Sequence, residues 1–327
     1  MNTIASRVST LEAALDQLRR GTGTGTGPRT LTQILDLVVL CDQEREARAM
    51  RKVLAKLPAN RPSRALIALA QHEPRETEAE ASLVEYPSSG ASDAPPLASE
   101  VVQLVSGDGG VALPAAIAGL LLPDLPVYLL LRLDPTRWPA LVNGVWPLAS
   151  RVVVDSTHEA TALLTVPQLI ARPPSVPVTD LSWTKLTGWR DTVARLFDDP
   201  RGARSLGKLT RLSITHVGKS TAQARLMAAW ISSRTGIEPR VEIVSIARRD
   251  MRSGSLVSVE LGCGNQEFSI HRVDEGVAEV RSPNLPVHRV RLHVPAFAEL
   301  LSEELELTDH DGPFEDAVAA LDAGFAT

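Results

Sequence analysis

Apolar residues in the first half of the chain form short continuous runs, with helix-like segments between them. The runs are ILDLVVLC (34–41), RALIALA (64–70), EVVQLVSG (100–107), PVYLLLRL (126–133) and RVVVDS (151–156). Continuous apolar runs are typical of parallel strands that helices cover on both faces. The segments between them predict helices at 43–57, 112–122 and 158–170. We therefore expect a layered α/β domain with a mostly parallel sheet over residues 29–171.

Two segments depart from this pattern. Residues 1–20 carry an apolar stripe at spacings of three and four, which predicts an amphipathic helix. GTGTGTGP (21–28) follows, and its alternating glycines predict a flexible tether. Residues 72–99 are rich in Glu, Ser and Pro, and only 83–86 resemble a strand there. We predict that this stretch is a short hairpin arm that ends in a solvated loop.

A proline-rich stretch, RPPSVPV, marks the clearest domain boundary. Its prolines cannot continue the preceding helix, and they favour an extended backbone. We therefore place a linker at residues 172–179 between the first domain and a second one at 180–327.

The second domain begins with a different order of elements. An apolar stripe predicts a helix over 181–198, with Asp180 as its N-cap. A strand at 209–217 and a helix at 220–235 precede a series of strands with period-two alternation, and two helices close the chain. Strands grouped after one helical crossover predict an α+β domain with a largely antiparallel sheet.

Composition and charge narrow the class of protein. The chain has 327 residues and a formal net charge of −5, which argues against a nucleic-acid binder. Residues 201–300 have a basic excess, but they lack the aromatic side chains of a base-stacking platform. Two cysteines, Cys41 and Cys263, are too few for a disulfide framework and fit a reducing cytosol. The first residues lack the continuous apolar region of an export signal, so we expect a cytoplasmic protein.

The stretch 111–131 is long enough to cross a bilayer, and Asp124 is its only charged residue. Pro123 and Pro126 break it in the middle, and a carboxylate is costly in hydrocarbon. The stretch therefore predicts a buried helix, a turn and a buried strand, with no membrane span.

GKST at 218–221 lies between a predicted strand and a predicted helix, where the end of a phosphate-binding P-loop would lie. The glycine that such a loop needs five residues earlier is Ser213 here, and 213–217 belong to the strand. We therefore interpret GKST as a helix start. The sequence also shows no metal-ligand spacing and no nucleophile or acid/base constellation. We expect no cofactor, no metal and no enzymatic activity.

Charged residues follow several strands of the first domain. Asp42, Arg132, Asp134 and Asp155 lie at or just past the carboxyl ends of predicted parallel strands. Open α/β sheets bind ligands at this edge, although charged strand ends are also common without a ligand. One function that remains open is therefore a sugar-phosphate or nucleotide-binding regulatory protein that uses this edge.

Several segments resemble one family, in order along the chain. They are ILDLVVLC, RPSRALIA (61–68), EVVQLVSG, LLLPDLPVYLLLR (120–132), VVVDS (152–156), DLSWTKLTGWRDTVARLFDD (180–199), ARLMAAWISSRTG (224–236) and ELLSEELE (299–306). Together they resemble the glucose-6-phosphate dehydrogenase assembly proteins called OpcA, and DLSWTKLTGWR is the most specific of them. The chain departs from the family at Leu130 and Leu131, where tryptophans are common, and at Gly188, where a proline is common.

This resemblance implies a non-enzymatic protein that binds glucose-6-phosphate dehydrogenase, promotes its active oligomer and acts as an allosteric activator in the oxidative pentose phosphate pathway. The residues that we predict to contact this partner are Asp124, Arg132, Asp180, Trp183, Trp189 and Arg190. Tryptophans at helical spacing also commonly pack against their own domain. For Trp183 and Trp189, both interpretations remain open.

Overall fold

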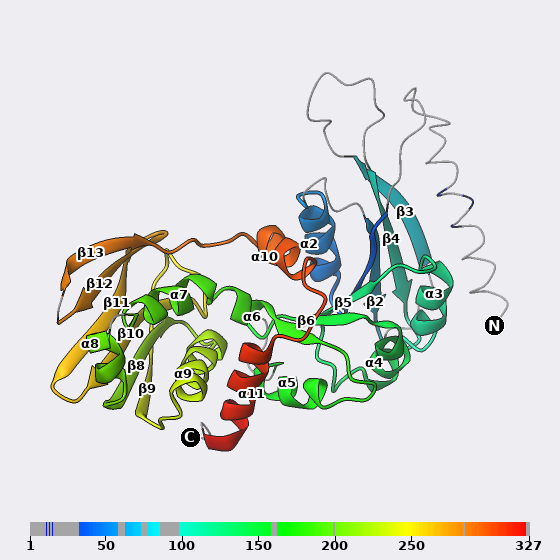
Figure 1. The fold of residues 1–327 in the computed structure, drawn as a ribbon. Helices are drawn as coiled ribbons and strands as arrows, with labels where there is room; N and C mark the ends of the chain where they lie inside the picture. The colour runs from blue at the N-terminus through cyan, green and yellow to red at the C-terminus, as the bar shows by residue number, and fades with distance from the viewer. Residues whose placement is uncertain are drawn as a thin grey trace. The chain divides into compact units, whose positions relative to one another are not determined.

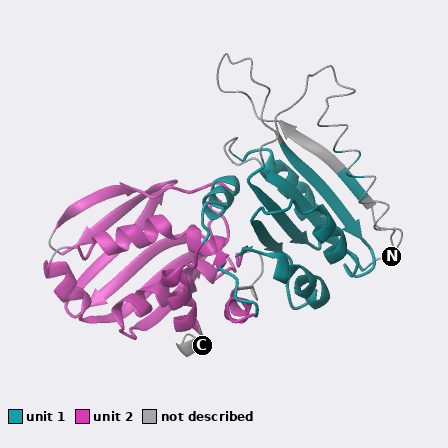
Figure 2. Ribbon diagram, turned by 45° about the vertical axis from the view of Figure 1, so that its right-hand side comes forward, with its two compact units in different colours: residues 1–154, 173–177, 297–308 teal, residues 155–172, 178–296, 309–327 magenta. Residues whose placement is uncertain are grey.

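The computed structural model describes residues 33–57, 63–72, 78–85, 98–157, 162–198, 200–283 and 285–324, together with Leu11, Ala13 and Leu15 (Figure 1). Two compact units make up the chain (Figure 2). The first contains residues 1–154, 173–177 and 297–308, and the second contains residues 155–172, 178–296 and 309–327. The predicted N-terminal helix and Gly/Thr tether lie outside the described residues, apart from the three named positions.

The first unit is built on a sheet of mostly parallel strands. Its strands are β1 (Leu35–Cys41), β2 (Ser63–Ala70), β3 (Glu78–Glu85), β4 (Ala98–Ser106), β5 (Val127–Arg132) and β6 (Arg151–Val154). They lie in the order β3-β4-β2-β1-β5-β6, and only the pair of β3 and β4 is antiparallel. Every residue of β1 and β2 is buried, which explains their continuous apolar runs.

Helices cover both faces of this sheet. They are α2 (Glu44–Leu54), α3 (Leu113–Leu120), α4 (Pro139–Val145), the 3-10 helix η1 (Trp146–Leu148) and α10 (Phe297–Glu304). The chain moves from β1 to β2 in one direction along the sheet and from β4 to β5 in the other. Right-handed crossovers then place α2 and α3 on opposite faces, as Figure 1 shows.

The second unit contains a six-stranded sheet. Its strands are β8 (Leu209–Val217), β9 (Arg240–Ile246), β10 (Leu256–Cys263), β11 (Gln266–Asp274), β12 (Val277–Ser282) and β13 (Leu285–Arg291), in the order β13-β12-β11-β10-β8-β9. Neighbouring strands are antiparallel, except that β8 and β9 are parallel across the crossover helix α9 (Ala222–Thr235). The remaining elements are α5 (Ala162–Ile170), β7 (Val178–Asp180), α6 (Leu181–Thr184), α7 (Thr187–Arg195), α8 (Pro200–Leu206) and α11 (Gly312–Gly324).

The two sheets confirm the predicted fold class, an α/β layer with a mostly parallel sheet followed by an α+β part with a largely antiparallel one. The predicted boundaries at 29–171, 172–179 and 180–327 stay a prediction. The two compact units are not continuous along the chain, because residues 155–172 group with the second unit and residues 297–308 with the first.

Two local predictions differ from the structure. The single helix predicted over 181–198 is divided into α6 and α7. The Thr187 hydroxyl donates to the Thr184 carbonyl at 2.8 Å, and a continuous helix would pair that carbonyl with the amide of Gly188. The short helix α8 has no counterpart in the prediction.

The apolar stretch 111–131 contains helix α3, a turn and the start of β5, as the prolines predicted. The left-handed backbone of Asp124, with φ of 64°, lies in that turn. None of the helices in the described part of the chain has the length and apolarity of a membrane span. Within the predicted hairpin arm, β3 is longer than the 83–86 piece, and residues 86–97 lie outside the described ranges.

Candidate functional site

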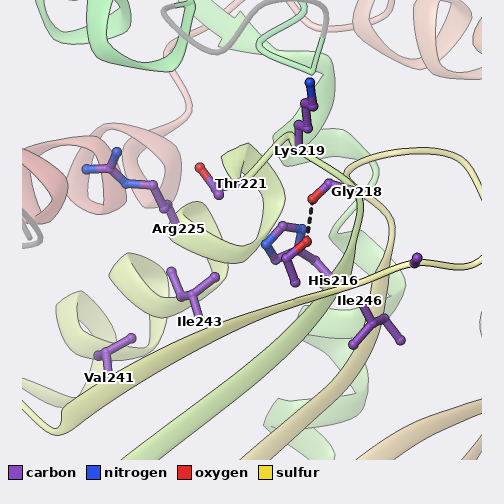
Figure 3. A pocket seen from close by; sticks show the side chains of 10 residues that line it. His216, Gly218, Lys219, Thr221, Arg225, Val241, Ile243 and Ile246 are labelled. Carbon is purple, nitrogen blue, oxygen red and sulfur yellow. Dashed lines mark hydrogen bonds between the residues drawn. The ribbon is translucent and has the colours of Figure 1, made fainter.

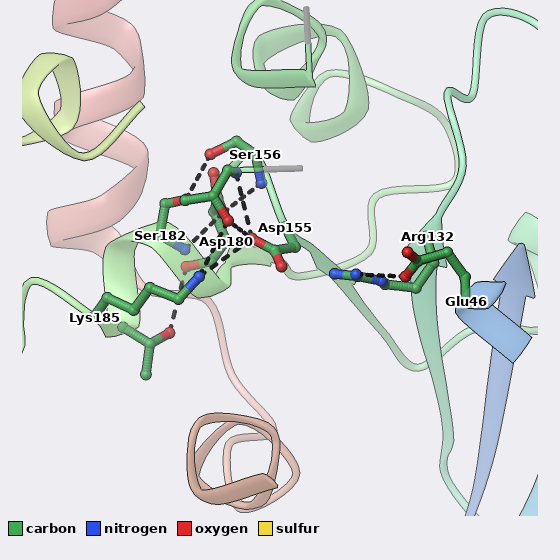
Figure 4. Close-up of polar contacts among 9 residues, drawn as sticks. Glu46, Arg132, Asp155, Ser156, Asp180, Ser182 and Lys185 are labelled. Atoms are coloured by element: carbon green, nitrogen blue, oxygen red, sulfur yellow. Dashed lines mark hydrogen bonds and ion pairs between the residues drawn. The ribbon is translucent and has the colours of Figure 1, made fainter. Parts of the chain in front are cut away.

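The segment that carries the most specific resemblance begins at Asp180, which caps helix α6. The Asp180 Oδ1 atom accepts the amide of Ser182 at 2.8 Å and that of Ser156 at 3.1 Å (Figure 4). The side chain is completely buried, and this burial raises its pKa from 3.8 to about 6, although the hydrogen bonds from Ser156 and Ser182 oppose the shift. The predicted N-cap is therefore confirmed, and its carboxylate organises the two serine-containing turns around it.

Lys185 extends along the same turns. Its Nζ atom lies 3.4 Å from Asp155 Oδ1 and 3.2 Å from Thr157 Oγ1 (Figure 4). The Lys185 side chain is 23% exposed, so the ammonium group ties the turn after β6 to α6 and still reaches solvent. No local pattern in the sequence pairs these residues, because Asp155 and Lys185 are 30 positions apart.

Trp183 packs within its own unit. Its Nε1 atom donates to Asp311 Oδ2 at 2.8 Å, and its ring lies 5.6 Å from that of Phe314 on α11. The guanidinium carbon of Arg190 lies 3.5 Å from the centroid of the indole ring, a cation–π contact. Only 2% of Trp183 is exposed. Arg190 and Asp311 are half-buried.

Trp189 is also buried, with 3% of the residue exposed, and Arg272 lies 5.6 Å from its ring. The burial of both indole rings supports the interpretation that this stripe packs against its own unit. As partner contacts, Asp180, Trp183, Trp189 and Arg190 stay predictions. The structure brings Trp183 and Arg190 together in one contact.

The predicted residues of the first unit lie apart from one another. Arg132, at the end of β5, has its Nη2 atom 2.7 Å from Glu46 Oε2 (Figure 4). Its guanidinium carbon lies 5.1 Å from the centroid of the Phe297 ring. Asp124 is exposed on the turn before β5. Both remain predicted partner contacts, and Arg132 is also part of a largely buried ion pair.

The other charged strand ends of the first unit are engaged within the chain. Asp42 Oδ2 accepts Trp138 Nε1 at 3.0 Å, and Asp134 Oδ1 accepts the amide and hydroxyl of Thr136 at 2.9 and 2.7 Å. Carboxylates that already accept hydrogen bonds from their own chain are poorly available to a ligand. This edge of the first sheet therefore has little free chemistry for binding a sugar phosphate or a nucleotide.

The turn at 218–221 is short and held by Ser253. The Ser253 hydroxyl oxygen accepts the amides of Lys219 and Ser220 at 3.2 and 3.4 Å. Gly218 has φ of 71°, and a Cβ atom at this position would lie 2.6 Å from Ser253 Oγ. The structure therefore agrees with the interpretation of GKST as a helix start, because β8 runs to Val217 and leaves no loop that could wrap a phosphate.

A cavity of about 830 Å³ beside this turn was not predicted from the sequence (Figure 3). It lies between β9 and the first turns of α9, with His216, Lys219 and Thr221 among its lining residues. The only signal in the sequence was the strand, turn and helix order around GKST, which is equally typical of an ordinary helix start.

The two cysteines add little to this chemistry. Cys41 and Cys263 are buried, and burial raises the pKa of their thiols to about 12 and about 11. Thiols with such high pKa values are poor nucleophiles. Within the described ranges, no group of three or more His, Cys, Asp or Glu side chains is placed to hold a metal ion.

Solved structures show only distant similarity. The glucose-6-phosphate 1-dehydrogenase from Mycobacterium avium matches with a TM-score of 0.48 and 11% identity, over 89% of this chain and 90% of that chain. An oxidoreductase from Sinorhizobium meliloti matches with a TM-score of 0.47 and 8% identity, over 89% of this chain and 90% of that chain. At these TM-scores, neither match identifies the fold or the function of this chain.

Comparisons by sequence are more informative. The OxPP cycle protein OpcA of Synechocystis sp. is 30% identical over 121 residues, which are 36% of this chain and 25% of the relative. The OxPP cycle protein OpcA of Nostoc punctiforme is 29% identical over 126 residues, which are 38% of this chain and 27% of the relative. Each match spans about a quarter of the relative's length. Residues 176–318 match the family described as the C-terminal domain of a glucose-6-phosphate dehydrogenase subunit. These matches confirm the resemblance to the OpcA proteins found in the sequence, and the family match covers residues 176–318, less than half of the chain.

Proposed function

We propose that this chain is a cytoplasmic, non-enzymatic assembly factor that binds glucose-6-phosphate dehydrogenase, promotes its active oligomer and activates it allosterically. The observation that carries this proposal is the match of residues 176–318 to a family described as a domain of a glucose-6-phosphate dehydrogenase subunit. The names of the curated relatives, OxPP cycle protein OpcA, support a role in the oxidative pentose phosphate pathway.

The geometry favours a protein-contact role over the ligand-binding alternative at the first sheet. Asp42 and Asp134 accept hydrogen bonds from Trp138 and Thr136, and Arg132 pairs with Glu46. The residues of the most specific segment are instead fixed in place by buried contacts, and the half-buried Arg190 places its guanidinium over a buried tryptophan. An arginine supported by an aromatic ring is a common anchor in protein interfaces.

The test uses the purified chain and the dehydrogenase of the same organism. The proposal predicts that the chain pulls down the dehydrogenase and that adding the chain raises dehydrogenase activity until the partner is saturated. Absence of a complex, together with unchanged activity and an unchanged oligomer size, would overturn the proposal.

A charge-reversal pair locates the contact. Arg190→Glu reverses the charge over Trp183. Arg195→Glu changes an arginine of the same helix that is 72% exposed and pairs with Asp191 one turn away. We expect Arg190→Glu to weaken dehydrogenase binding by about tenfold or more, because an interface charge then faces the wrong sign, and Arg195→Glu to have a much smaller effect. Circular dichroism and a thermal melt show whether each variant is folded. If both variants are folded and bind the dehydrogenase equally well, Arg190 is not part of the interface.

A further inference from the structure

The cavity beside the start of α9 has the position of a ligand site. It measures about 830 Å³, which lies within the range of small-molecule sites, roughly 300–1,000 Å³. The parallel pair β8 and β9 ends there, and the crossover helix α9 begins there (Figure 3). The carboxyl ends of parallel strands are where open α/β sheets place their ligands.

One end of this cavity is electropositive. Helix α9 has 14 residues, and its N-cap Thr221 makes no hydrogen bond from its side chain to the first turn. The amides at the start of such a helix carry a partial positive charge that favours anions. Lys219 lines the cavity immediately before the helix, and Ser253 holds the backbone of this turn in place.

His216 supplies a second, independent observation. The residue is only 1% exposed, it lines the cavity, and its Nδ1 atom has no hydrogen-bond partner in the part of the chain that the structure describes. Figure 3 shows its ring extending from β8 toward the start of α9. Burial lowers the pKa of this imidazole, and a hydrogen bond with the backbone of Val217 opposes part of this shift. The ring is therefore neutral at pH 7. Buried polar atoms without a partner are rare in proteins, and a ligand is one way to satisfy them.

Part of the wall along β9 is apolar, although Ser245 and Arg225 also line the cavity. Val241 and Ile243 of β9 line the side that faces α9. An anionic group at the helix start and an uncharged body along β9 would together fill the two halves of the cavity.

We propose that this cavity binds a small phosphate monoester, with the phosphate at the start of α9 beside Lys219 and the rest of the molecule against β9, within reach of His216. The site lies in the second unit and goes beyond the proposed assembly function, which does not require it. Hydrolysis is not part of the proposal, because the turn lacks the loop of a P-loop.

Isothermal titration calorimetry on the full chain tests this proposal without the dehydrogenase. Two esters, glucose 6-phosphate and adenosine 5′-monophosphate, distinguish a sugar from a nucleotide body, and glucose and adenosine are their matched controls. We expect at least one ester to bind and its phosphate-free counterpart to bind at least tenfold more weakly. Failure of both esters to bind at millimolar concentration would overturn the proposal.

Two lysine variants and hydrogen exchange then locate the binding site. Lys219→Ala removes the lysine of the cavity, and Lys208→Ala removes an exposed lysine just before the other end of β8. We expect Lys219→Ala to weaken ester binding by tenfold or more and Lys208→Ala to leave it unchanged. Hydrogen exchange of the unmodified chain should show protection by the ester at residues 216–225. Equal affinity of both variants, or protection confined to other segments, would overturn the assignment.

The outcome is separable from that of the proposed function. Lys219→Ala is expected to retain dehydrogenase binding in the pull-down. If the chain binds the dehydrogenase but no ester, the proposed ligand site is wrong and the assembly function stands. If it binds an ester but no dehydrogenase, the assembly function is wrong and the ligand site stands.

Discussion

Replacement of Asp180 by Asn tests the electrostatics of the cap at the start of α6. Asp180 is completely buried, its Oδ1 atom accepts two amides, and its Oδ2 atom has no hydrogen-bond partner in the described part of the chain. Asn keeps an oxygen for the two amides and cannot ionise. The substitution therefore removes the buried charge while it preserves the cap.

The expected change in the free energy of unfolding follows from the pKa of Asp180. In the folded chain the pKa of Asp180 is about 6, compared with 3.8 for an ordinary aspartate, because burial disfavours the ionised form. At about 1.4 kcal/mol for each pKa unit, this difference corresponds to about 3 kcal/mol. Between about pH 4 and pH 6 the folded state holds the proton more tightly than the unfolded state, so the contribution of Asp180 to stability falls as the pH rises. The loss is complete above the folded-state pKa.

The assay is urea unfolding of the wild type and of Asp180→Asn at pH 4, 5, 6 and 7. We expect the free energy of unfolding of the wild type, minus that of the variant, to fall by about 2 kcal/mol from pH 4 to pH 7, because part of the full effect is already lost at pH 4. Asp191→Asn, a change at an exposed carboxylate on α7, is the control and should show a much smaller trend. A difference between wild type and Asp180→Asn that stays constant across this range would refute the argument.

Two other substitutions test single contacts. Trp183→Phe removes the hydrogen bond to Asp311 and should lower the free energy of unfolding by about 1.5–3 kcal/mol, because its acceptor is a carboxylate. In urea unfolding, Trp189→Phe should lower the free energy of unfolding by less than Trp183→Phe does. Equal decreases for the two variants would contradict a strong hydrogen bond from Trp183 to Asp311. Gly218→Ala should cost about 1–3 kcal/mol, because it combines a left-handed φ with a contact to Ser253, and unchanged thermal stability would contradict that strain.

The sequence predicted what depends on local periodicity. The continuous apolar runs of β1 and β2 required a parallel sheet covered on both faces, and the structure buries every residue of both strands. The N-cap role of Asp180 was likewise readable, because capping involves residues only two positions apart.

What the sequence missed depends on pairings over long distances in the chain. Arg64 and Glu100 are buried inside adjacent strands, where their side chains lie 2.8 Å apart, and neither strand alone indicates the pairing. The hydrogen bond from Trp183 to Asp311 spans 128 positions. The cavity beside Lys219 likewise depends on β9 pairing with β8, and this neighbourhood is set by the topology of the sheet.

The molar mass of the dehydrogenase in solution tests the central claim most directly. Size-exclusion chromatography with light scattering gives this mass with and without the chain, and an activity assay on the same fractions reports the function. The account predicts a complex that contains both proteins, a larger dehydrogenase oligomer and higher activity in those fractions. Separate elution of the two proteins, with the mass and activity of the dehydrogenase unchanged, would contradict it.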